Sequence, residues 1–365
     1  MHLSPSLDKY TKEQLSAREA QRLAEFISWG PAVFQASRLM IKFGILDLIR
    51  DSADGITREE IVQQTSLSDY AVKCLLEASL CIGIVLVNPE TERFTISKAG
   101  WFLLNDKITR INIDFNHDLN YKAWYNLEES LQNGKPEGLK HYGDWRTVYE
   151  GLSQLPENVQ KSWFAFDHFY SDSAFPQALD IVFNKHNVRT LYDIGGNTGK
   201  WALQCVDYND DVEVTVIDLP QQIQMLQQNI ANNPNAHRIK GLSVDILDKD
   251  ATIPKHEKGL DAIWMSQFLD CFSMEQIVDI LSKVKRAMNR NTRVFILETL
   301  WDRQKYEPAA MNLMMTSLYF TAVANGNSKM YNTEDLHACI QQSGLAIEEI
   351  HDHLGLGHSI IVCKK

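Results

Sequence analysis

The chain has 365 residues, which is enough for two domains with separate cores. Its hydrophobic fraction of 44% and charged fraction of 23% are those of an ordinary globular protein, and they argue against a disordered chain. The 36 Lys and Arg residues are outnumbered by 47 Asp and Glu residues, and the resulting net charge of -11 disfavours binding to nucleic acid.

The six cysteines lie in apolar segments and form no Cys-x-x-Cys pair. This pattern indicates reduced thiols in the core rather than disulfides or a zinc site. The first residues lack the apolar stretch of a signal peptide, and no apolar run reaches the roughly 18 residues of a membrane span. We therefore expect a cytoplasmic protein without a membrane partner.

The N-terminal third has the pattern of a small helical domain. Apolar residues recur at helical spacing over residues 18–50, and the segment 57–60 reads Thr-Arg-Glu-Glu, the pattern of a capping box. Two short β-rich segments, 84–87 and 93–96, then flank a turn in the manner of a wing. We interpret residues 1–105 as a winged-helix-like domain.

A winged helix can bind DNA, but the charges of this one argue against it. Between residues 51 and 100 there are four basic and eight acidic side chains, which gives four minus eight, or -4. The helix in the recognition position, 69–80, carries Lys73 as its one basic residue, whereas a DNA-reading helix needs several. We predict packing and dimerisation, not nucleic-acid binding, for this domain.

The remainder of the chain predicts an α/β fold. Residues 106–185 are helical and aromatic, and they are interpreted as a connector that contributes to a substrate pocket. From residue 186 to 365, β-type runs alternate with helical stretches, which is typical of a parallel sheet covered on both faces. The predicted strands are 190–194, 212–218, 241–246, 260–268, 292–297, 346–350 and 359–363. The short link between the last two requires antiparallel pairing, so we predict a Rossmann-like, mostly parallel seven-stranded sheet with an antiparallel C-terminal strand.

A glycine-rich turn follows the first predicted strand, in the segment Asp193-Ile194-Gly195-Gly196-Asn197-Thr198-Gly199. Glycines here let a ligand approach the backbone closely at the carboxyl end of the strand. The dinucleotide fingerprint is not matched, because Asn197 stands in place of its second glycine, and no Lys-Ser or Lys-Thr pair completes a phosphate loop. The turn therefore argues against cofactors that are bound through their phosphates.

Acidic residues end the next two predicted strands. Asp218 lies 23 residues after Gly195, at the position from which a carboxylate accepts hydrogen bonds from both ribose hydroxyls. Asp245 is placed to bind the exocyclic amine of an adenine, with Ile246 and Leu247 able to cover the ring. The alternative for each aspartate is a helix cap or a loop carboxylate.

Three segments together carry a resemblance to a known family: the glycine turn, Ile217-Asp218-Leu219-Pro220, and Asp261-Ala262-Ile263-Trp264-Met265. Behind a winged-helix N-terminus, this pattern resembles the S-adenosylmethionine-dependent O-methyltransferases of the plant caffeate and bacterial polyketide type. The resemblance implies S-adenosylmethionine as cofactor, S-adenosylhomocysteine as product, no metal, and a homodimer. The residues expected to bind the cofactor are Asp193, Gly195, Gly196, Gly199, Asp218, Leu219, Asp245, Ile246, Ser266 and Gln267.

The chain departs from the family at its catalytic positions. Asp270 occupies the position of the family's general base, a histidine, while Glu298 matches the glutamate that orients it and Met330 replaces a second glutamate. A free Asp has a pKa of about 3.9, far below the value near 7 that suits deprotonation of a phenol. Burial beside Glu298 could raise the pKa of Asp270; alternatively, the acceptor is already acidic and Asp270 only orients it.

The acceptor pocket is expected to be apolar. A stripe of methionines and aromatic residues over 311–320 matches the family's acceptor helix, although such stripes more often form core. By the same resemblance, Phe166 and Tyr170 would lie over the reacting methyl group. The residues expected to bind the acceptor, a small hydrophobic or aromatic metabolite, are Trp124, Phe166, Tyr170, Met311, Met315 and Tyr319.

Two other functions stay open at this point. The first is an enzyme of the same fold that binds S-adenosylmethionine but has altered chemistry, such as hydroxylation, and the missing histidine and second glutamate leave it open. The second is a winged-helix regulator that senses a metabolite, and the acidic helix-turn-helix argues against it.

Overall fold

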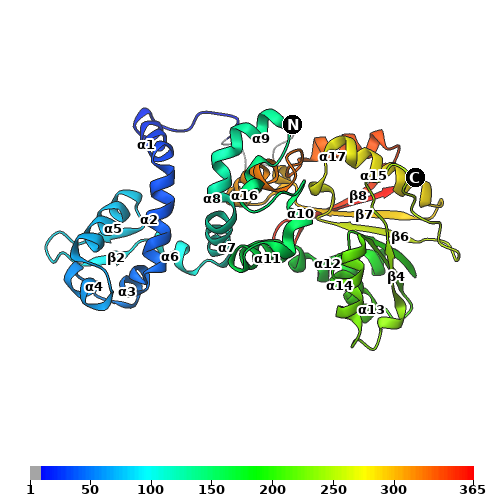
Figure 1. Cartoon of the computed structure of the whole chain (residues 1–365), viewed down its shortest axis with the longest axis horizontal. Coiled ribbons are helices and arrows are strands. Elements are labelled where there is room, and N and C mark those ends of the chain that lie inside the picture. Colours follow the sequence, from blue (N-terminus) through cyan, green and yellow to red (C-terminus); the bar gives the residue numbers. More distant parts are fainter. Residues whose placement is uncertain (1–9) are drawn as a thin grey trace. The chain divides into compact units, whose positions relative to one another are not determined.

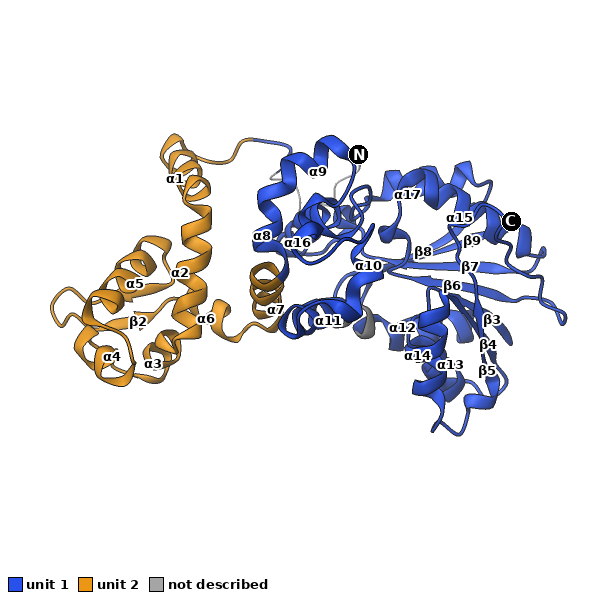
Figure 2. Ribbon diagram, in the orientation of Figure 1, with its two compact units in different colours: residues 1–12, 119–365 blue, residues 13–118 orange. Residues whose placement is uncertain are grey.

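The computed structural model describes residues 10–365, apart from the side chains of residues 168–172. The chain forms two compact units, one of residues 13–118 and the other containing residues 119–365 (Figure 2). Among the described residues, no helix is both long and apolar enough to cross a membrane.

The first unit is helical apart from one small hairpin. The capping box is confirmed: Thr57 Oγ1 accepts a hydrogen bond from the backbone N–H of Glu60, and the carboxylate of Glu60 accepts one from the N–H of Thr57. The predicted wing is confirmed as an antiparallel strand pair in which Val85 lies opposite Ile96. The elements of this unit are α1 (Ala17–Ser28), α2 (Gly30–Lys42), α3 (Ile45–Asp51), α4 (Arg58–Gln64), α5 (Asp69–Ile82), β1 (Val85–Val87), β2 (Phe94–Ile96), α6 (Lys98–Asn105) and α7 (Lys107–Phe115).

The boundary of this unit falls after Asp118, later than the predicted boundary at residue 105. The physical reason is that α6 packs on α3 and on α7, which keeps both helices with the first unit. The core of this unit consists of apolar residues from α2 to β1, including Met40, Ile45, Leu46, Ile49, Ile61, Val72, Leu76 and Ile84.

The helical segment that follows belongs to the same unit as the sheet. Its α9 and its 3-10 helix η4 both pack on the π-helical turn η11 (Phe320–Ala324), which extends α16 (Glu307–Tyr319). The elements of the segment are α8 (Tyr121–Ala123), η3 (Trp124–Asn126), α9 (Leu127–Asn133), η4 (Glu137–His141), α10 (Val148–Gly151), η5 (Leu152–Gln154), α11 (Glu157–Ser171), η6 (Asp172–Ala174), α12 (Phe175–Leu179) and η7 (Asp180–Lys185).

A seven-stranded sheet forms the centre of the second unit, and the predicted fold is confirmed. Its strand order is β5-β4-β3-β6-β7-β9-β8, and β9 is antiparallel to both of its neighbours while the pairs from β5 to β7 are parallel. The strands are β3 (Thr190–Ile194), β4 (Glu213–Asp218), β5 (Ile239–Ser243), β6 (Ala262–Ser266), β7 (Arg293–Glu298), β8 (Ala346–Leu354) and β9 (His358–Lys364).

Helices cover both faces of the sheet, as the near-continuous apolar strands require. On one face lie α12, α13 (Lys200–Tyr208) and α14 (Pro220–Ile230), and on the other lie α15 (Met274–Ala287) and α17 (Thr333–Gln342) (Figure 1). Consecutive residues of one strand therefore enter different cores: Trp264 of β6 packs with α13, and Met265 packs on the opposite side.

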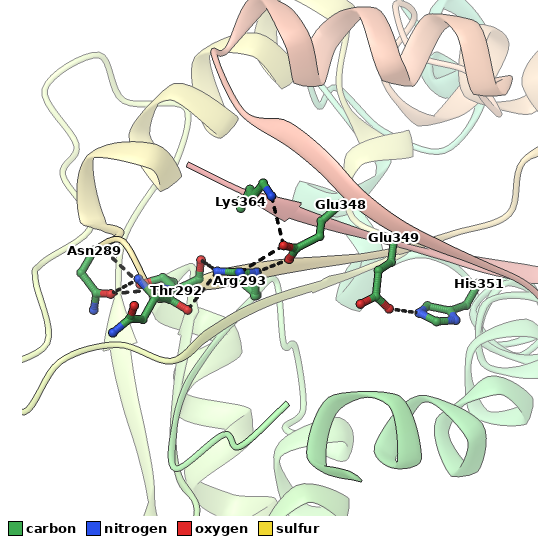
Figure 3. Close-up of polar contacts among 8 residues, drawn as sticks. Asn289, Thr292, Arg293, Glu348, Glu349, His351 and Lys364 are labelled. Atoms are coloured by element: carbon green, nitrogen blue, oxygen red, sulfur yellow. Dashed lines mark hydrogen bonds and ion pairs between the residues drawn. The ribbon is translucent and has the colours of Figure 1, made fainter. Parts of the chain in front are cut away.

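Ion pairs fasten the antiparallel end of the sheet. Arg293 at the start of β7 pairs with Glu348 on β8, and Lys364 on β9 donates to the same carboxylate over 3.2 Å (Figure 3). Further along β8, Glu349 pairs with His351 over 2.8 Å. Arg293, Glu348 and Lys364 join three neighbouring strands, whereas Glu349 and His351 both lie on β8, and none of these side chains lines the cavity described below.

Candidate active site

A cavity of about 1060 Å³ lies at the carboxyl ends of β3, β4 and β6. This is the edge at which open parallel sheets bind ligands, where the strand order reverses. The volume is at the upper end of the range for small-molecule sites, so the cavity has room for a nucleoside-sized ligand and a second small molecule. All of the residues predicted to bind the cofactor line it except Gly199.

The glycine turn forms one wall of the cavity and depends on positive φ angles. Gly195 has φ of 74° and donates a hydrogen bond from its N–H to the carbonyl of Ile217 on β4. A Cβ atom added to Gly195 would lie 2.2 Å from the ring of Phe268, so only glycine fits. Gly199, with φ of 80°, packs instead on Leu226, where an added Cβ would lie 2.1 Å from a methyl carbon. Gly199 therefore supports the turn on the side that faces away from the cavity.

Asp218 lies at the end of β4 and faces this turn. Its two carboxylate oxygens each accept one backbone hydrogen bond, from Asn197 over 2.8 Å and from Leu219 over 2.7 Å. Burial raises the pKa of Asp218 above its ordinary value, and the two N–H groups oppose that shift. Asp218 lines the cavity and each of its oxygens can accept a further hydrogen bond, which suits the hydroxyls of a ribose.

Asp245 lies in a loop and not in a strand. The predicted third strand ran to Ile246, but β5 ends at Ser243, so Asp245 follows the sheet by two residues. Its side chain instead forms an Asx turn by accepting a hydrogen bond of 3.0 Å from the N–H of Leu247. Asp245, Ile246 and Leu247 all line the cavity next to Asp218.

Three buried polar atoms of the cavity wall lack a hydrogen-bond partner among the residues that the structure describes. They are Oδ2 of Asp193 and the indole nitrogens of Trp201 and Trp264, whose rings stack with centroids 4.0 Å apart. Burial and the nearby charge of Asp218 raise the pKa of Asp193 to about 8. Because unpaired buried polar atoms are costly, this end of the cavity suits a ligand with polar groups of its own.

The two predicted catalytic carboxyls lie together behind the cavity wall. Oε1 of Glu298, at the end of β7, accepts hydrogen bonds from the backbone N–H groups of Phe268 and Leu269, over 3.1 and 2.8 Å. Burial raises the pKa of Asp270 to about 6, and burial together with the charge of Asp270 raises the pKa of Glu298 well above its ordinary value. A general base at this position needs a raised pKa, and the pKa of Asp270 is raised in the structure. Neither carboxyl lines the cavity itself.

A short chain of hydrogen bonds connects Asp270 to the cavity. The hydroxyl of Tyr149, which lines the cavity, donates to Sγ of Cys271 over 3.1 Å, and the thiol of Cys271 lies 3.5 Å from Oδ1 of Asp270. Burial raises the pKa of the Cys271 thiol well above its ordinary value, so the thiol stays protonated. Asn325 fixes the same residue by donating to the carbonyl of Cys271 over 2.8 Å.

Sequence reasoning missed Tyr149, Cys271 and Asn325 as site residues. Cys271 directly follows Asp270, and this adjacency was the one available signal. Tyr149 lies on α10, in a segment without a motif, and Asn325 was noted only as part of a turn.

Of the six residues predicted to bind the acceptor, the five whose side chains the structure describes do not line the cavity. Met311 and Met315 lie on the outer side of α16, where 45% and 61% of their surfaces are exposed. Tyr319 is buried and accepts a hydrogen bond of 2.7 Å from the indole of Trp163, a residue that does line the cavity. Trp124 and Phe166 are half-buried, and the side chain of Tyr170 lies outside the described residues. Their roles stay predictions.

Comparisons with known proteins agree with this arrangement. Residues 21–94 match the Dimerisation2-like domain, and residues 124–345 match the O-methyltransferase domain. The chain is 22% identical to acetylserotonin O-methyltransferase of Gallus gallus over 77% of this chain and 81% of that protein. It is 20% identical to a mitomycin biosynthesis 6-O-methyltransferase of Streptomyces lavendulae, over 86% of each chain.

Among solved structures, the apo form of the S-adenosylmethionine-dependent methyltransferase SibL has the same fold, with a TM-score of 0.69. That comparison covers 93% of this chain and 98% of SibL at 20% identity. The O-methyltransferase match spans more than half of the chain, so the predicted enzyme class, an S-adenosylmethionine-dependent methyltransferase, is confirmed. The chain belongs to the O-methyltransferase domain family.

Proposed function

We propose that the cavity binds S-adenosylmethionine together with a small hydrophobic or aromatic acceptor, and that the chain methylates a hydroxyl of this acceptor without a metal. The observation that carries the proposal is the meeting of three elements in one cavity: the glycine turn, Asp218 and the loop of Asp245. The products are the methylated acceptor and S-adenosylhomocysteine.

The chain offers a partner for each part of the cofactor. Asp218 would accept hydrogen bonds from the ribose hydroxyls, and Asp245 would bind the adenine amine while Ile246 and Leu247 cover the ring. The unpaired atoms of Asp193 and the two indoles suit the charged amino-acid portion. When bound, the cofactor supplies a methyl group on a positively charged sulfur, which is open to attack by an oxygen nucleophile.

Asp270 is the group that we propose accepts the acceptor's proton. With a pKa of about 6, it is a stronger base than a free aspartate and is still ionised at neutral pH. The hydroxyl of Tyr149 and the thiol of Cys271 connect it to the cavity. A proton that leaves the acceptor for Tyr149 is balanced by transfer of the Tyr149 proton to Cys271 and of the thiol proton to Asp270.

Calorimetric titration tests cofactor binding. Wild-type protein is titrated with S-adenosylmethionine, next to Asp218→Asn and the control Asp250→Asn, an exposed carboxyl outside the cavity. We expect wild type and control to bind equally, and Asp218→Asn to bind about tenfold more weakly because hydrogen bonds to a charged carboxylate are lost. Lack of binding by the wild type would exclude the proposal.

A methyl-transfer assay tests the acceptor class. The protein is incubated with methyl-labelled S-adenosylmethionine and a panel of phenols, enols and aliphatic alcohols, and label in the organic products is measured. We expect transfer to flat aromatic hydroxyl compounds, and Tyr149→Phe should slow it because the connection between the cavity and Asp270 is broken. Label in the aliphatic alcohols alone would contradict the acceptor class.

The first unit is the proposed homodimer interface. Its α1 buries no residue, and the side chains of Leu23, Phe26, Ile27 and Trp29 are exposed. Exposed apolar side chains grouped on one amphipathic helix are typical of a protein interface. Light scattering of Ile27→Glu, compared with the wild type, tests this assignment, and a dimeric variant would argue against it. All six cysteines are free thiols, which supports a reducing cytoplasm as the proposed location, although Cys74 and Cys81 are exposed and not in the core as the sequence predicted.

A further inference from the structure

Lys283 is a buried lysine on α15 whose ammonium group holds the backbone of the Asp245 loop. Only 1% of its surface is exposed. Nζ donates to the carbonyl of Ile246 over 2.7 Å, to the carbonyl of Asp248 over 2.8 Å and to the carboxylate of Asp279 over 2.7 Å. An ammonium has three donors, so every one of them is used.

The loop needs such an anchor because the sheet holds only its first residue, Val244, whose N–H donates to the carbonyl of Asp218 over 2.9 Å. β5 ends at Ser243, and residues 244–248 form no strand or helix. Within the loop, hydrogen bonds from the N–H groups of Leu247 and Asp248 both end on Asp245. These local bonds shape the turn, but they do not attach it to the rest of the protein. The two bonds from Lys283 attach it to α15.

The position of Lys283 distinguishes it from a ligand-binding residue. Residues 244–248 line the cavity and Lys283 does not, so the ammonium acts on the loop from outside the cavity. Its helix neighbour Arg286 is exposed and makes no such contact among the described residues. A buried charge of this kind persists where all its donors are paired, and a neutral replacement would leave two carbonyls unpaired.

We infer that Lys283 is a positioning residue that sets the loop of Asp245 for the nucleoside part of the cofactor. The inference rests on the proposed function, because it assigns a purpose to a loop that we propose binds adenine. The role of Lys283 does not depend on a ligand: without Lys283, we expect the backbone of residues 245–248 to be less ordered even when no ligand is bound.

Hydrogen exchange of the ligand-free protein tests that claim. Lys283→Met keeps the length of the side chain and removes the charge, and Arg286→Met is the matched control on the same helix. We expect amides of the peptide 244–251 to exchange about tenfold faster in Lys283→Met, the factor that follows from losing one hydrogen bond of a charged group. The control should exchange like the wild type. Unchanged exchange in Lys283→Met would overturn the inference.

A milder variant, Asp279→Ala, distinguishes a local effect on the loop from unfolding of the whole protein. The side chain of Asp279 is about half exposed, so Asp279→Ala should leave the core intact. This change removes the carboxylate that orients the ammonium, and we expect a smaller acceleration in the same peptide. Acceleration spread over the whole sheet would show a general loss of stability and overturn the positioning role.

Ligand binding gives the second measurement. Titrations with S-adenosylhomocysteine and with adenosine should show about tenfold weaker binding of both to Lys283→Met, since both ligands place an adenine on the loop. Equal affinities for variant and wild type would overturn the inference and leave the proposed function intact. If the wild type bound neither ligand, the proposed function would fail, and the exchange experiment would still decide whether Lys283 orders the loop.

Discussion

Glu298 accepts a hydrogen bond of 2.8 Å from the backbone N–H of Leu269, the residue before Asp270. The same oxygen accepts a second bond from the N–H of Phe268, so a carboxyl at the end of β7 holds the short 3-10 turn after β6 that carries Asp270. The glutamate is therefore tied to backbone groups, including that of Asp270, and it acts on the carboxyl of Asp270 through charge. This arrangement separates two roles, holding the turn and accepting a proton, that variants can distinguish.

Glu298→Gln and Glu298→Ala separate these roles. Glutamine retains an oxygen for the two N–H groups, so Glu298→Gln should keep wild-type stability and most of its methyl transfer. Alanine leaves two buried donors unpaired and should lower the free energy of unfolding by about 1–3 kcal/mol. Urea denaturation and the transfer rate measure both effects. If Glu298→Gln were as inactive as the alanine variant, the charge of the carboxyl would be required.

Asp270→Asn tests the proton acceptor through the pH dependence of the rate. Asp270 must be ionised to accept a proton, and burial raises its pKa to about 6, so the wild-type rate should rise with pH up to about 6 and then level off. Asn cannot accept the proton, so the variant should lose this limb and most of its rate. A variant with an unchanged rate and profile would remove Asp270 from the mechanism.

Asp193 makes stability depend on pH in a predictable direction. Its folded-state pKa of about 8 exceeds the value of an unfolded aspartate, so the folded state binds this proton more tightly. Its stabilising contribution is complete below about pH 4 and is lost as the pH rises to about 8. Across this pH range, the free energy of unfolding of Asp193→Asn should increase relative to that of the wild type, by up to about 1.4 kcal/mol per pH unit. Denaturation curves that give the same difference in unfolding free energy between the two proteins at every pH would refute the prediction.

Gly195→Ala should disturb the glycine turn more than the same change does elsewhere. The new Cβ would meet the ring of Phe268 at 2.2 Å in addition to the strain of a positive φ. Gly259→Ala is the matched control, because it shares a positive φ, 90°, but its Cβ would have only Asn289 within 4 Å, at 3.9 Å. The control should lose about 1–2 kcal/mol of stability from backbone strain, and Gly195→Ala should lose more. Thermal denaturation and cofactor titration measure the two changes.

The strand pattern and the spacing of the motifs were enough to predict the fold and to place Gly195 and Asp218 at one edge of the sheet, where both line the cavity. All seven strands were predicted within a few residues, because buried parallel strands appear as continuous apolar runs. Gly195 and Asp218 were found by their place at strand ends, and parallel strands bring such positions to one edge of the sheet. These are local patterns, or follow from the topology directly.

The contacts near Tyr149 and Cys271, where we propose that the acceptor binds, could not be predicted in this way. Met311 and Met315 were expected in the pocket because their stripe matches the family's acceptor helix, but their side chains are exposed on α16 and their role stays a prediction. Tyr149 and Cys271 are 122 residues apart in the chain, and their hydrogen bond exists only because α10 packs near the turn after β6. No spacing rule connects two such residues.

The sequence by itself determined the seven-stranded sheet, the glycine turn and the carboxylate at the end of β4, since each is specified by the residues that form it. Tertiary structure alone decided which lysine is buried and which carboxyls have a raised pKa. Lys283 has the same local pattern as an exposed helical lysine, and Asp270 that of a helix-capping residue. Burial gives Asp270 its raised pKa, and burial together with the carbonyls of the distant residues Ile246 and Asp248 gives Lys283 its role.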